Sequence, residues 1–78
     1  MKIKLPGIRR ISITGDYIRL DSLLKLSSVV STGGEAKLLI QNGEVRVGGV
    51  PCTMRGKKIR PGDDVWCEGS TLIVKRAI

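Results

Sequence analysis

Histidine and phenylalanine are absent from the sequence, and it contains only two cysteines. Histidine is a frequent general base and metal ligand in proteins, so its absence argues against a catalytic triad and a mixed metal site. Cys52 and Cys67 are too few and too far apart for a disulfide framework or a zinc site. We therefore expect two reduced, inert packing residues, and neither a metal nor a cofactor.

Long hydrophobic runs are also missing. The longest purely aliphatic run in the helical part of the sequence is Leu38-Leu39-Ile40, far short of the roughly 20 apolar residues that cross a bilayer. The N-terminal stretch MKIKLPGIRR lacks the apolar core of a signal peptide. These features predict a cytoplasmic protein that does not enter a membrane.

Acidic residues are few relative to basic ones. The sequence has fourteen Lys and Arg residues and seven Asp and Glu residues, which gives a formal charge of +7 and a pI of about 10.0. Such an excess in a small chain favours a polyanionic partner, most often nucleic acid and less often an anionic membrane surface. The alternative is a surface charge that only keeps the protein soluble.

Residue spacing in the first half predicts a strand followed by a helix. The length of 78 residues allows one domain, residues 1–78, with a thin core. The β-branched stretch Ile8–Ile13 is typical of a short strand. A first helix begins near Asp21, whose carboxylate would cap it and face the positive end of its dipole. This helix is expected to end near Ser27 or Ser28.

The second helix has clear end signals and an unusual start. Thr32 and Glu35 form a T-x-x-E capping box, and Gly43 is a natural C-terminal stop. The first two helical positions are Gly33 and Gly34, although each glycine costs about 1 kcal/mol relative to alanine. The start of this helix therefore has a feature that helix propensity does not explain.

The two faces of the second helix differ in polarity. Ala36, Leu39 and Ile40 recur at helical spacing and form an apolar face. Lys37 and Gln41, four residues apart, lie on another, more polar face.

From Glu44 onward, apolar and polar residues alternate with the period of a β-strand. Residues 45–52 are typical of a hairpin that turns at Gly48-Gly49. Residues 55–64, RGKKIRPGDD, are predicted to be a basic loop that a Pro-Gly turn closes. Residues 65–75 predict two further strands joined at Gly69-Ser70.

The order of these motifs resembles a known family. Residues 19–65 contain RLDSLLKL, STGGEAKLLIQNGEVRVGG and RGKKIRPGDDV. The series is similar to the S4 domain, the RNA-binding domain first described in protein four of the small ribosomal subunit and also called the α-L motif. It resembles in particular the short stand-alone bacterial members of the YaaA and YbcJ type.

The resemblance implies an α+β fold in which two helices from the N-terminal half pack on a small, mostly antiparallel sheet. It also implies RNA recognition on a surface shared by the helices and the adjoining hairpin. Tyr17 and Trp66 are the only aromatic residues, and Trp66 is expected to pack inside the fold. Recognition of structured RNA, such as ribosomal RNA or tRNA, by shape and backbone therefore fits better than base stacking.

The glycines of the second helix then have a functional interpretation. A helix N-terminus presents free N–H groups and the positive end of its dipole, and residues without side chains let a phosphate approach closely. We predict that Gly33, Gly34 and Lys37 receive an RNA phosphate. The alternative is that the glycines serve a tight turn between the helices.

Cationic side chains supply the rest of the predicted surface. Residues 55–60 place four cations in six residues with no acid among them, which predicts non-specific attraction of phosphate; the alternative is a solvated face. Arg19 opens the first helix, and its alternative role is an ion pair with Asp16 or Asp21. The predicted RNA-binding residues are Arg19, Thr32, Gly33, Gly34, Lys37, Gln41, Arg46, Arg55, Lys57, Lys58 and Arg60.

Catalysis is not expected. No serine has an evident base, and the stretch GGVPCTMRGKK has the wrong spacing for a phosphate-binding loop, with Lys58 at the Ser/Thr position. The sequence predicts a stand-alone RNA-binding module without a small-molecule substrate. The alternatives are an adaptor whose basic face meets an acidic protein, and a DNA-binding protein.

Overall fold

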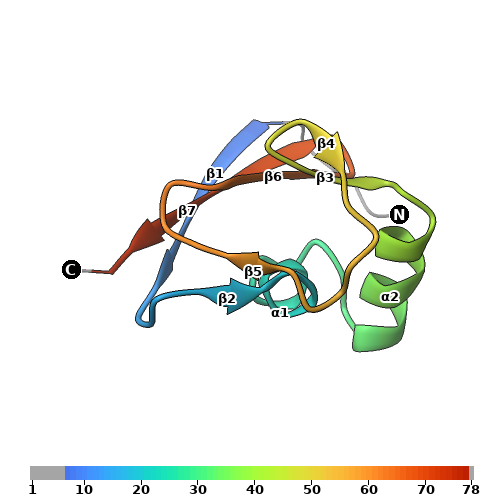
Figure 1. Ribbon diagram of the computed structural model, residues 1–78, viewed down its shortest axis with the longest axis horizontal. Coiled ribbons are helices and arrows are strands. Elements are labelled where there is room, and N and C mark those ends of the chain that lie inside the picture. Colours follow the sequence, from blue (N-terminus) through green and yellow to red (C-terminus); the bar gives the residue numbers. More distant parts are fainter. Residues whose placement is uncertain (1–6, 78) are drawn as a thin grey trace.

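Two layers make up residues 7–77, the part of the chain that the computed structural model describes (Figure 1). A five-stranded sheet forms one layer, and two helices with a two-stranded sheet form the other. The elements in chain order are β1 Gly7–Ile13, β2 Ile18–Arg19, α1 Leu20–Leu26, α2 Gly33–Gln41, β3 Val45–Val47, β4 Val50–Pro51, β5 Lys58–Ile59, β6 Asp64–Cys67 and β7 Ser70–Arg76.

The larger sheet has the strand order β1-β7-β6-β3-β4. Its β3–β4, β3–β6 and β6–β7 pairs are antiparallel, whereas β1 and β7 run parallel from Gly7↔Ser70 to Ile13↔Arg76. The smaller sheet pairs β2 with β5 in antiparallel register. The predicted α+β fold, with two helices on a mostly antiparallel sheet, is confirmed, and one parallel pair is added to it.

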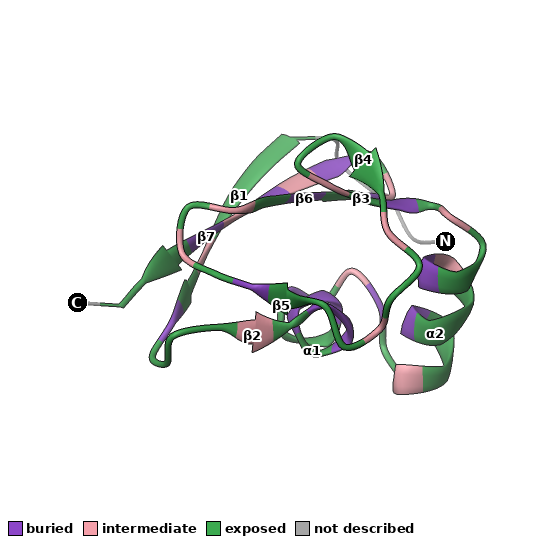
Figure 2. Cartoon of the chain, viewed as in Figure 1, coloured by how far each residue is buried: buried purple, intermediate pink, exposed green. Residues whose placement is uncertain are grey.

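The core lies between the two layers. Figure 2 shows buried residues on both helices and on strands of the larger sheet. The predicted apolar face of α2 is confirmed for Ala36 and Ile40, which are fully buried, while Leu39 is only partly buried. The remaining core residues are Ile13, Leu20, Leu23, Leu24, Val30, Val45, Ile59, Val65, Cys67, Leu72 and Val74.

The start of α1 differs from the prediction that Asp21 caps it. Arg19 occupies the capping position with an extended backbone and no side-chain cap, and Asp21 lies in the first turn. The N–H groups of Leu20 and Asp21 donate to the carbonyls of Lys57 and Arg55, at 2.9 and 3.2 Å. Because another segment of the backbone satisfies these donors, a capping side chain is not required.

In the turn between the helices, Ser28 is the residue with a left-handed backbone conformation. Ser28 has φ of 63°, whereas Gly33 and Gly34 are not among the residues with positive φ. The Ser28 N–H donates to the carbonyl of Lys25 and the Val29 N–H to that of Leu24, which is the hydrogen-bond pattern of a Schellman motif. The glycines of α2 therefore contribute no unusual backbone angle to this turn.

The end signals predicted for α2 are confirmed. The Glu35 N–H donates to the Thr32 hydroxyl at 3.1 Å, and the Glu35 carboxylate accepts from the Ser31 N–H at 2.8 Å. At the other end Gly43 adopts φ of 74°, and the Glu44 N–H reaches back to the carbonyl of Leu39. Both ends of α2 are thus stabilised by residues that are close in sequence.

Two details of the second half differ from prediction. The 55–64 segment is not wholly a loop, because Lys58–Ile59 forms β5 against β2. The turn between the last two strands lies one residue earlier than predicted, with positive φ at Glu68 and Gly69. The β3–β4 hairpin with its turn at Gly48-Gly49 is confirmed, although β4 is shorter than predicted and ends at Pro51.

Neither cysteine of the described chain forms a disulfide. Cys67 is buried in β6 as expected, and Cys52 is half buried just after β4. Within residues 7–77, no group of Cys, Asp and Glu side chains is placed to hold a metal ion. No helix in this range has the length and apolar character to cross a membrane.

Candidate nucleic-acid interface

The fold places the predicted RNA-binding residues in three groups. The first surrounds the start of α1, the second lies on the exposed side of α2, and the third is a single residue on β3. The first group is Arg19, Arg55, Lys57, Lys58 and Arg60; the second is Thr32, Gly33, Gly34, Lys37 and Gln41; the third is Arg46.

Backbone pairing assembles the first group. Arg19 of β2 lies opposite Lys58 of β5, and the carbonyls of Lys57 and Arg55 receive the first two N–H groups of α1. The guanidinium of Arg19 lies against Gly56, with Nη2 3.7 Å from the position that a Cβ would take. The basic segment 55–58 therefore wraps the start of α1, and cations far apart in sequence share one surface.

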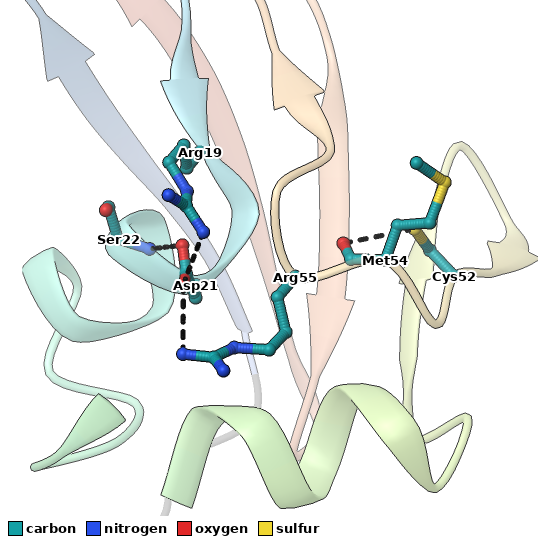
Figure 3. Close-up of polar contacts among 6 residues, drawn as sticks. All are labelled: Arg19, Asp21, Ser22, Cys52, Met54 and Arg55. Carbon is teal, nitrogen blue, oxygen red and sulfur yellow. Dashed lines mark hydrogen bonds and ion pairs between the residues drawn. The ribbon is translucent and has the colours of Figure 1, made fainter. Parts of the chain in front are cut away.

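One carboxylate serves two of these cations. Asp21 is buried, and its Oδ2 lies 3.2 Å from Nη2 of Arg19 and 3.6 Å from Nη2 of Arg55. Figure 3 shows the two guanidiniums approaching Asp21 from two sides. The ion pair considered as an alternative for Arg19 thus exists, with Asp21 as its partner.

This pairing leaves the cluster positive. The arginine side chains remain 56% and 40% exposed, so each ion pair contributes about 1 kcal/mol or less. Two guanidiniums share one negative charge, and Asp21 therefore orients them without neutralising both. The Nε of Arg55 is buried and has no acceptor in the described part of the chain.

The other cations of the first group lack a carboxylate partner for their side chains within residues 7–77. The Lys58 ammonium lies over the ring of Tyr17, 4.9 Å from its centroid. The Asp63 carboxylate accepts from the backbone N–H of Arg60 at 2.8 Å, which closes the Pro-Gly turn. No acid among the described residues therefore neutralises the side chains of Lys57, Lys58 and Arg60.

The second group extends along α2, with Thr32, Gly33 and Gly34 at the N-terminus of the helix. The N–H groups of Gly33 and Gly34 donate to no acceptor among the described residues, while the Thr32 hydroxyl and the Glu35 carboxylate are engaged in the cap. Among the described residues, a Cβ on Gly33 would meet nothing within 4 Å, and one on Gly34 would meet only the Thr32 hydroxyl, at 3.9 Å. The packing of residues 7–77 does not demand glycine at either position.

The exposed side of α2 continues from these glycines. Lys37 and Gln41 are exposed, as their spacing predicted. Neither side chain makes an ion pair in residues 7–77. The glycine N–H groups and the Lys37 ammonium therefore belong to one solvent-facing helix end.

Arg46 lies apart from the other two groups, next to Trp66. The prediction that Trp66 packs inside the fold is wrong. Trp66 is 42% exposed rather than packed inside, and the Arg46 guanidinium lies 5.8 Å from its ring centroid. Its neighbours Val65 and Cys67 are both fully buried, so the alternation along β6 turns Trp66 to the outer face of the sheet. That alternation is visible in the sequence and was the signal for an exposed tryptophan.

Comparisons with known proteins extend the sequence resemblance. A family model described as the S4 domain matches residues 11–75, beyond the 19–65 stretch on which the motifs lie. The chain is also 42% identical over 59 residues to a probable ribosome maturation protein, RlbA, of Bacillus subtilis (strain 168). That alignment covers 76% of this chain and 83% of the relative.

Proposed function

Since the chain belongs to the S4 domain family, we propose that it is a non-enzymatic module that binds structured RNA. The basic surface around the start of α1 and the N-terminus of α2 would make the contacts. The name of the Bacillus relative refers to ribosome maturation, which favours ribosomal RNA over tRNA as the target.

The gathering of cations around α1 is the observation that carries this proposal. Like charges on one surface repel. A cluster that shares a single carboxylate among the described residues is therefore favourable mainly when a polyanion approaches. Exposed Lys and Arg side chains on such a surface contact phosphates, and each contact releases counterions. A charge that served only solubility would not require this concentration in one place.

The N-terminus of α2 supplies a second kind of contact. The N–H groups of Gly33 and Gly34, which have no acceptor within residues 7–77, lie at the helix end where the dipole favours an anion. The Glu35 carboxylate at the same end opposes an anion, but it is already bonded to the Ser31 N–H. Lys37 lies one turn further along and adds a positive charge to the same end.

Replacing Arg55, Lys57 and Lys58 together by alanine should weaken binding to different RNA hairpins by similar factors. Phosphate contacts carry no base information, so the loss should not depend on sequence. The slope of log affinity against log salt should become shallower by about two to three, as expected for three lost contacts. Titrations of several hairpins at several salt concentrations measure both quantities.

A matched control removes three charges elsewhere. Arg10, Lys25 and Lys75 are exposed and make no ion pair in the described chain. Their joint replacement by alanine should change affinity less than the loop variant does. Equal losses of RNA affinity in the two variants would mean that the loop contributes only net charge. Unchanged affinity in the loop variant would mean that its cations face solvent and do not contact RNA.

Replacing Gly34 by alanine should have opposite effects on stability and binding. The position is helical with room for a Cβ, so the variant should be more stable by about 0.4–1 kcal/mol. A phosphate resting on the backbone would meet the new methyl group, and RNA affinity should fall. Thermal unfolding and an RNA titration of the same variant measure the two effects. A stabilised variant with unchanged affinity would remove Gly34 from the site.

Nuclease treatment separates the proposal from its alternatives. Complexes recovered from cells should dissociate after RNase digestion if the partner is RNA. Release by DNase alone would favour DNA, and resistance to both nucleases would favour an acidic protein. Crosslinking followed by sequencing of the bound RNA then identifies the target.

A further inference from the structure

A hollow of about 510 Å³ opens beside the β2–β5 ladder, next to the basic surface. Its volume falls within the range of about 300–1,000 Å³ that is usual for sites of small organic ligands. The lining combines one aromatic ring and three cations with a single acid. The lining residues are Asp16, Tyr17, Lys58, Arg60, Pro61 and Arg76.

The aromatic ring in this hollow does not belong to the core. Tyr17 is 46% exposed, and the ammonium of Lys58 lies 4.9 Å from its ring centroid. An exposed ring gains less from apolar burial than a core ring does, and nearly half of the Tyr17 surface stays open to a ligand. Such a ring offers a flat surface on which a nucleobase can stack.

The charged side chains that line the hollow form only a weak ion pair among the described residues. Arg76 lies 3.8 Å from Asp16, and the two side chains are 59% and 90% exposed, so water screens this pair. Lys58 and Arg60 form no ion pair in the described chain. A phosphate would therefore meet three cations and compete with one weakly held carboxylate.

We propose that this hollow, the Tyr17 pocket, binds one unpaired nucleotide of the RNA. The base stacks on the exposed part of the Tyr17 ring, and the phosphate lies among Lys58, Arg60 and Arg76. A phosphate alone would use the cations but neither the ring nor most of the volume, whereas a nucleotide uses all three. The inference rests on the proposed function and adds Tyr17 and Arg76 to the RNA-binding residues.

A thermodynamic cycle tests whether the base contacts the ring. One change removes the base from the RNA, and the other removes the ring of Tyr17 from the protein. The probe is a short RNA hairpin with one unpaired uridine, compared with the same hairpin carrying an abasic site at that position. For the unmodified protein, removal of the base should weaken binding by about 5- to 150-fold, the range for stacking on an aromatic side chain. For Tyr17→Ala, the same removal should change affinity less than about twofold, because the contact is already lost.

Tyr17→Phe and Asp16→Asn complete the design. Tyr17→Phe keeps the ring and should retain the full effect of the base. Asp16→Asn removes the acid from the hollow and should tighten binding by about two- to fivefold, a gain that loss of structure would not produce. Thermal unfolding of all three variants establishes that they are folded.

The outcomes separate this inference from the proposed function. Suppose that removal of the base weakens binding equally in the unmodified protein and in the Tyr17→Ala variant, while binding still depends on Arg55, Lys57 and Lys58. That result would overturn the Tyr17 pocket alone. Failure of the unmodified protein to bind either hairpin at low salt would overturn both proposals. Non-additive effects together with the gain in Asp16→Asn would support the nucleotide site.

Discussion

RNA affinity should fall by about 50- to 1,800-fold when the salt concentration rises from about 50 to 200 mM. The expectation follows from about four to six phosphate contacts, each of which lowers the slope of log affinity against log salt by about 0.7–0.9. The exposed cations around α1 and on α2 are numerous enough for this number of contacts. Titration of a labelled RNA hairpin at several salt concentrations measures the slope.

The comparison with a variant makes this test specific. The protein with Arg55, Lys57 and Lys58 replaced by alanine should show a shallower slope, whereas Gly34→Ala should leave the slope nearly unchanged because it removes no cation. A flat salt response in the unmodified protein would refute electrostatic binding. It would indicate instead that the exposed aromatic rings supply most of the affinity.

Replacing Ile40 by alanine should destabilise the fold by about 2–5 kcal/mol. Ile40 is fully buried at the C-terminal end of α2, and its removal leaves a cavity in a thin core. In a domain of this size the loss corresponds to a decrease in melting temperature of roughly 10–40 °C. Thermal or denaturant unfolding measures it directly.

Leu38→Ala is the matched control on the same helix. Leu38 is 62% exposed, so its truncation should change stability by no more than about 0.5 kcal/mol. Because Ile40 holds α2 against the core, Ile40→Ala should also loosen the packing of this helix. Similar losses in the two variants would contradict the packing of α2 through Ile40.

Features that depend on neighbouring residues were predictable from the sequence. The capping box of Thr32 and Glu35, the stop at Gly43 and the turn at Gly48-Gly49 all occur where predicted. Each depends on hydrogen bonds or backbone angles within a few residues, so the local sequence contains the necessary information. The family resemblance extended these local features to the α+β fold.

The two errors have different causes, because a distant segment supplies the surroundings of Asp21, whereas the local alternation of β6 sets those of Trp66. Asp21 was expected to cap α1, but the carbonyls of Lys57 and Arg55 take over that role. Trp66 was expected in the core because it is large and apolar, yet its place in the alternation of β6 puts it outside. Residue type alone misled both predictions, since burial and capping are set by what packs nearby.

The sequence by itself determined that this is a basic α+β chain with a well-capped second helix and a resemblance to an RNA-binding family. Only the tertiary structure decided that β1 pairs in parallel with β7, that segment 55–58 wraps α1, and that Tyr17 and Arg76 share a hollow with Lys58. These contacts join segments far apart in the chain, and their geometry depends on how the whole core closes. No pattern within a short window of residues specifies it.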